Sequence, residues 1–228
     1  MATTLLNLRT QAKQRANMEQ SSFVSDSEWN SYINNAASAL YDLLVQAYED
    51  YYLIMPPTEF TLASGESKKA LPADFYKLRG LDYKLGNADF VQIEQFQFGE
   101  RNSAKIIDIR RIFDEAPITY RLMGNYIQFL PEDRAPGTYR LWYIPKFTPM
   151  TSDSDTFDGV NGWEEFIVIA AAIKALSKEE SDVTALAAEY QELKDRITGL
   201  AAERDAGSSE RITDVYRFRR TYWYDDDY

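Results

Sequence analysis

The chain has 228 residues, of which 45% are hydrophobic and 14% aromatic, enough to bury a substantial core. Lysine and arginine number 25 against 36 aspartate and glutamate residues, so the formal net charge is −11. A chain this acidic has no general affinity for nucleic acid, because binding phosphates requires a basic face. Cysteine and histidine are both absent, which excludes disulfides, thiolate metal sites and every imidazole acid–base scheme.

Neither a membrane segment nor a targeting segment is expected. No apolar run approaches the ~20 residues that span a bilayer. The first nine residues lack the charged-then-apolar order of a signal peptide. We therefore expect a soluble protein, made in a cytoplasm, with no membrane partner.

Two helices are predicted before residue 57. Over residues 4–18, leucines and alanines recur at helical spacing. Ser25 followed by Glu28 is a capping-box pattern, in which each side chain satisfies a backbone donor of the first turn. An apolar stripe over residues 29–51 continues this second helix, and two prolines at 56–57 end it because proline lacks the amide hydrogen.

Residues 58–150 show short alternating runs, interrupted by glycine and proline, that are typical of β-strands. Residues 59–63 and 78–83 each predict a strand. Residues 118–130 predict a tight hairpin around Gly124-Asn125, since both residues tolerate a positive φ. Residues 137–144 then add a third strand, so we predict a β-meander.

Two more helices are predicted towards the C-terminus. Asn161 can cap a helix over residues 163–177 that is apolar nearly all round and therefore buried on more than one side. Residues 178–182 make a turn, and residues 183–204 carry apolar side chains on one face and charged ones on the other. These two segments predict an antiparallel helical hairpin.

The predicted fold class is α+β and predominantly helical: a helical bundle with a β-meander insertion and an extended C-terminal arm. Two N-terminal helices and the C-terminal helical hairpin make up the bundle. The predicted division is residues 1–57 for the N-terminal helices, 58–150 for the β-rich insertion, 151–206 for the hairpin that completes the bundle, and 207–228 for the arm.

No catalytic, cofactor or metal site is predicted. The glycines form neither a dinucleotide-binding nor a P-loop pattern, and no nucleophile has a recognisable activator. Asp153, Asp155 and Glu164 match part of the spacing of a calcium loop. However, Phe157 occupies a ligand position and Gly159 comes one residue late. A solvated acidic loop leading into a helix is the favoured interpretation.

The C-terminal segment differs from the rest of the chain. Between Arg211 and Tyr224, four arginines, one aspartate and five aromatic residues give a local charge of +3. Arginine and aromatic residues supply most binding energy at protein interfaces, so we predict an arm that orders against a neighbouring subunit. The alternatives are a flexible terminus without a partner, a strand that completes its own domain, and an arm that binds nucleic acid. The predicted partner-binding residues are Tyr216, Arg217, Phe218, Arg219, Arg220, Tyr222, Trp223 and Tyr224.

In the order of these elements, nearly the whole chain resembles the head-to-tail adaptor proteins of tailed bacteriophages. Such proteins contain short segments similar to three in this chain: LPADF at 71–75, GWEEF at 162–166 and ITDV at 212–215. The resemblance implies a structural virion protein of the neck, made in the host cytoplasm, with no catalytic residues. It also implies a ring, usually of twelve copies, between the portal protein and the tail tube or nozzle protein.

In such rings DNA is only in transit through the lumen during genome ejection, and an acidic lumen suits this role because it repels phosphate. The family's arm, residues 212–228 here, reaches along the portal or a neighbouring subunit. Another virion component, such as a tail nozzle, tail terminator or neck protein, is the alternative. A small carboxylate- or metal-dependent enzyme is a distant one.

Overall fold

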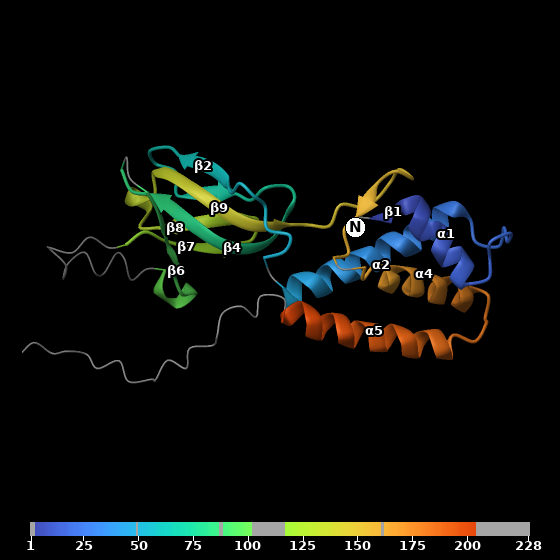
Figure 1. Ribbon diagram of the computed structural model, residues 1–228. Coiled ribbons are helices and arrows are strands. Elements are labelled where there is room, and N and C mark those ends of the chain that lie inside the picture. Colours follow the sequence, from blue (N-terminus) through green and yellow to red (C-terminus); the bar gives the residue numbers. More distant parts are fainter. Residues whose placement is uncertain (1–2, 49, 87–88, 102–116, 161, 204–228) are drawn as a thin grey trace, which may run out of the picture.

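The computed structural model describes residues 3–48, 50–86, 89–101, 117–160 and 162–203 (Figure 1). These form two parts that lie side by side. One, the helical body, comprises the described residues of 3–57 and 150–203. The other, the two-sheet unit, comprises those of 58–149. The chain crosses from the helical body to the two-sheet unit and back again, so the unit is an insertion between α2 and α4.

The two N-terminal helices are α1 (Leu5–Arg15) and α2 (Asp26–Ala47). The predicted capping box is confirmed: Ser25 Oγ accepts from the Glu28 backbone N–H at 3.3 Å, and Glu28 Oε2 accepts from the Ser25 N–H at 3.0 Å. The helix ends at Ala47, earlier than the apolar stripe predicts. It ends there because the tyrosines that follow leave the helix and donate to Asp158.

The two C-terminal helices are α4 (Glu165–Lys178) and α5 (Thr184–Ala202), and they form the predicted antiparallel hairpin. Helix α4 packs against α1, α2 and α5, which explains why its sequence is apolar on all sides. Helix α5 lies at the surface and buries only Ile197 and Ala201 fully. The predicted cap Asn161 lies outside the described residues.

A short strand pair anchors the N-terminus to the loop before α4. Strand β1 (Thr3–Thr4) pairs antiparallel with β10 (Thr156–Phe157). No helix in the described ranges is long and apolar enough to cross a bilayer.

The two-sheet unit contains two four-stranded sheets packed face to face. The first has the order β2 (Thr58–Leu62), β9 (Gly137–Pro145), β4 (Phe75–Lys84), β5 (Phe90–Gln92). The second has the order β3 (Lys68–Ala70), β8 (Tyr126–Leu130), β7 (Thr119–Met123), β6 (Glu94–Gln95). All neighbours are antiparallel except β6 and β7. The 3-10 helices η1 (Phe98–Glu100) and η2 (Glu132–Arg134) lie in the connections.

The predicted hairpin is confirmed, but the predicted meander is wrong. Strands β7 and β8 are joined at Gly124, which has φ +61°. Strand β9 does not continue beside β8; it lies between β2 and β4 of the other sheet. Its Tyr139 packs across the sandwich on Phe129 of β8, with the rings 4.5 Å apart, and stacks on Phe60 of the neighbouring strand β2 at 5.4 Å. Burying these rings between two sheets places β9 opposite β8.

Replacing Ser25 by alanine removes the acceptor for the Glu28 N–H in the first turn of α2. We expect the free energy of unfolding, measured by urea denaturation, to fall by about 1 kcal/mol. The matched control is Ser31→Ala on an exposed position of the same helix, which should change it by less than about 0.5 kcal/mol. Equal losses in the two variants would show that the capping box does not stabilise α2.

Candidate interaction surfaces

The junction between the helical body and the two-sheet unit is held by polar contacts from both sides. Tyr41 of α2 donates to the carbonyl of Pro145, and Tyr76 of β4 donates to Asp42 at 2.8 Å. Arg79 Nε lies 2.7 Å from a carboxylate oxygen of Asp50. Because these contacts come from separate elements, they fix the orientation of the two parts.

Aromatic rings fill the same junction. The ring of Tyr41 lies 4.3 Å from that of Tyr52, 6.1 Å from that of Phe147 and 6.2 Å from that of Tyr76. Tyr52 also donates to the Asp158 carbonyl at 2.8 Å. Burial raises the pKa of the Tyr52 hydroxyl, and the nearby Asp158 raises it further. The junction is therefore packed as well as hydrogen-bonded.

The acidic loop before α4 uses its first two carboxylates to hold itself in place. Asp155 accepts from the backbone N–H groups of Thr151 and Ser152 at 2.7 and 2.8 Å, which lowers the pKa of its carboxyl group. Asp153 binds the guanidinium of Arg9 on α1 at 2.9 Å.

The remaining carboxylates of the loop have other partners. Asp158 accepts from the Tyr51 hydroxyl at 2.6 Å, and Glu164 accepts from the Gly159 N–H at 3.3 Å. Within the described ranges, no three acidic side chains converge as a metal site would require. The loop is a structural connection, and the calcium interpretation is not supported.

Charge is divided unevenly between the two parts. The described residues of the helical body include seven basic and seventeen acidic side chains, a net charge of −10. Those of the two-sheet unit include ten basic and nine acidic side chains, a net charge of +1. The three basic residues of α1 form ion pairs with carboxylates of the body: Arg9 with Asp153, Lys13 with Asp26, and Arg15 with Glu165 and Glu189.

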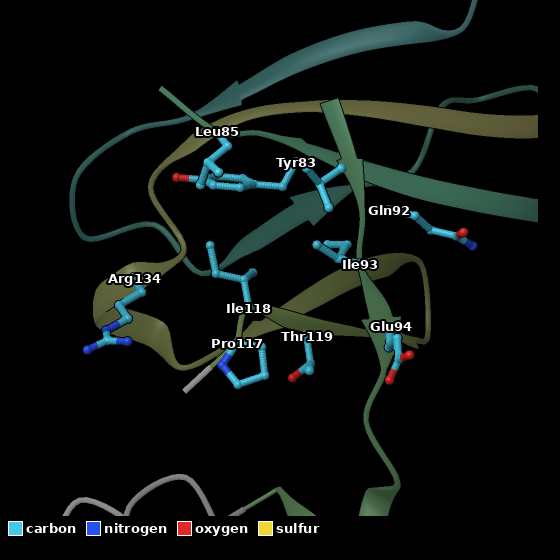
Figure 2. Close-up of a pocket in the computed structure, with 10 residues that line it drawn as sticks. Tyr83, Leu85, Gln92, Ile93, Glu94, Pro117, Ile118, Thr119 and Arg134 are labelled. Atoms are coloured by element: carbon cyan, nitrogen blue, oxygen red, sulfur yellow. The ribbon is translucent and has the colours of Figure 1, made fainter. Parts of the chain in front are cut away.

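A cavity of about 710 Å³ opens between the two sheets beside β5 and β6 (Figure 2). Its apolar lining consists of Tyr83, Leu85, Val91, Ile93, Pro117 and Ile118. Figure 2 shows Ile93 and Ile118 near the centre, with the polar heads of Glu94 and Arg134 on opposite sides. The size is that of a pocket for a small ligand, and the apolar lining suits several apolar or aromatic side chains.

The eight predicted partner-binding residues, from Tyr216 to Tyr224, lie outside the described residues. Their role stays a prediction. Neither the junction nor the cavity was predicted from the sequence. Three closely spaced tyrosines, at positions 48, 51 and 52, are a sequence feature from which the junction could have been predicted. The cavity has no such local feature, because it lies between two sheets formed by distant segments.

The family model described as SU10 adaptor protein matches residues 3–215, nearly the whole chain. The chain belongs to the SU10 adaptor protein family. This is a phage head-tail adaptor family of structural proteins, so the predicted resemblance is confirmed and the enzyme alternative is wrong. Membership makes this SU10-type adaptor a virion component that binds other virion proteins. Comparison with curated proteins finds no match.

The buried Tyr41 hydroxyl of the junction predicts that the free energy of unfolding falls at alkaline pH. Burial raises the pKa of Tyr41 from 10.0 to about 12, with smaller effects from Tyr76 and Asp42. The unfolded chain ionises first, so the stability that this protonated hydroxyl supplies is complete below pH 10. It is lost as the pH rises to about 12.

We expect Tyr41→Phe to lower the free energy of unfolding at neutral pH by about 1 kcal/mol, because the donor to the Pro145 carbonyl is lost. The variant should also lose less stability above pH 10 than the parent does. Urea denaturation over a pH series measures both. Tyr126→Phe, at an exposed position of β8, is the control. Identical alkaline curves for parent and Tyr41→Phe would refute the role of this hydroxyl.

The contacts of the acidic loop predict that divalent cations do not change the thermal stability of the protein. Millimolar calcium or magnesium should leave the melting temperature unchanged, because the four carboxylates bind separate partners. Differential scanning fluorimetry measures this. A rise in melting temperature that disappears in Asp155→Asn would instead indicate a metal site in the loop.

Proposed function

We propose that this SU10-type adaptor forms a ring in the neck of the virion, between the portal protein and the tail tube or nozzle protein. The observation that carries the proposal is the division of charge. A net charge of −10 on the helical body disfavours binding to DNA. The two-sheet unit has a net charge of +1, which leaves it free to contact protein. An adaptor around a DNA channel needs both properties.

A ring follows from one contact repeated between identical copies until the rotation closes. Twelve is the number that the resemblance implies. In this proposal the N-terminal helices (residues 1–57) and the C-terminal hairpin (residues 151–206) build the wall, and residues 58–150 are an appended unit. Residues 207–228 are the arm.

DNA passes through the lumen without being held. The ion pairs of α1 support this, because Arg9, Lys13 and Arg15 already neutralise carboxylates of the same body. Cations engaged in this way contribute little to phosphate binding, which depends on releasing counterions from the duplex.

The arm supplies the contact that links subunits of the neck. Residues Tyr216 to Tyr224 combine aromatic side chains and arginine, the types enriched at interface hot spots. Their partner is a neighbouring subunit, either the portal protein or another copy of the adaptor.

Mixing the purified adaptor with portal protein tests this function. We expect a monomer or weak oligomer alone, and a ring bound to the portal in the mixture, as measured by mass photometry and negative-stain imaging. Deleting residues 212–228 should abolish binding to the portal and leave the melting temperature unchanged, because the helical core of the described residues is complete at Ala201.

The matched control deletes only residues 225–228, which removes three aspartates and Tyr228 and keeps the aromatic and arginine residues from Tyr216 to Tyr224. This variant should bind as the parent does. Normal rings from the longer deletion would show that the arm makes no essential contact. Failure of the intact adaptor to form rings with the portal would contradict the ring itself.

A further inference from the structure

Among the described residues, the two-sheet unit has a sheet edge next to its cavity that pairs with no further strand. Strand β5 is the last strand of one sheet and β6 is the last of the other, so residues 90–95 follow both edges. In the described part of the chain, β5 pairs only with β4. Its outer row of backbone groups can therefore accept a further strand, which is a common mode of peptide recognition.

Apolar side chains beside this edge are exposed. Val91 and Ile93 both line the cavity, and Leu85 of the adjoining turn lines it too. Val91 is 53% exposed and Leu85 is 61% exposed. Apolar exposure around an open cavity marks a binding surface, because covering it gains hydrophobic free energy.

The C-terminal arm has the sequence of a strand that fits this edge. Tyr216 and Phe218 alternate with Arg217 and Arg219. Successive side chains of a strand point to opposite faces, so an extended arm over residues 216–224 would place four aromatic rings on one face together with Arg220, and Trp223 on the other face with Arg217 and Arg219. The rings match the apolar cavity.

The arm is long enough to reach another copy. Helix α5 ends at Ala202 on the side of the helical body that faces the two-sheet unit (Figure 1). Residues 204–228 follow it, and an extended chain of that length spans about 80 Å at ~3.3 Å per residue.

We propose that residues 216–224 of one adaptor copy add as a strand along the β5–β6 edge of a neighbouring copy and insert their aromatic side chains into its cavity. This rests on the proposed ring, in which each copy has a neighbour within reach, and it names the arm's partner as a second copy. Each subunit both gives an arm and receives one, so the contact is heterologous and closes with the ring.

Single-cysteine variants test the proposal, because the natural chain has no cysteine. Val91→Cys and Phe218→Cys are purified separately as full chains, mixed, assembled with portal protein and treated with a short bismaleimide. We expect a covalent dimer in the mixture and no dimer in either variant alone. Leu200→Cys, at an exposed position of α5, replaces Val91→Cys in the matched control and should give no dimer with Phe218→Cys.

Three results would overturn this inference alone. Rings that form on the portal without the mixed dimer would refute the cavity as the arm's site while leaving the proposed function intact. A double variant Val91→Cys/Phe218→Cys that only cross-links within one chain would show that each arm binds its own copy. Crosslinking of the Phe218→Cys variant to the portal alone would assign the arm to the portal. Absence of rings would overturn the proposed function and this inference together.

Discussion

The packing of α4 against α1 and α2 is the contact on which the rest of the adaptor depends. These helices come from opposite ends of the chain, and their buried side chains form one core with α5. The two-sheet unit has its own core and is inserted between the two pairs of helices. Junction contacts such as Tyr41 to Pro145, and Ile144 of β9 packed in the helical core, then orient the two cores with respect to each other.

Local chemistry made part of this fold predictable. Ser25 and Glu28 specify the start of α2 by themselves, and Gly124 with Asn125 specifies a hairpin, because each pattern acts within a few residues. The apolar surface of α4 likewise predicted burial on several sides. Four helices, their pairing and the position of the insertion therefore followed from the sequence.

Features decided by distant contacts were not predictable. Strand β9 lies beside β2 and opposite β8 because Tyr139 packs on Phe60 in its own sheet and on Phe129 in the other, which no local pattern encodes. The end of α2 at Ala47 depends on Asp158, more than 100 residues further along the chain. The same holds for the cavity beside β5 and β6, which exists only because two sheets diverge there. The arm's composition, by contrast, is visible in the sequence alone.

The insertion also sets the order in which the chain can fold during synthesis. The two-sheet unit has all its strands once residue 145 has emerged from the ribosome, but the helical core needs Ala201. Until then the apolar stripe of α2, including Ile33 and Leu40, lacks α4 and α5, which pack against α2 in the finished body. At 5–20 residues per second, making the intervening chain takes on the order of ten seconds. The period in which a nascent adaptor exposes this stripe is therefore set by the speed of translation, whatever the folding rate of the helices.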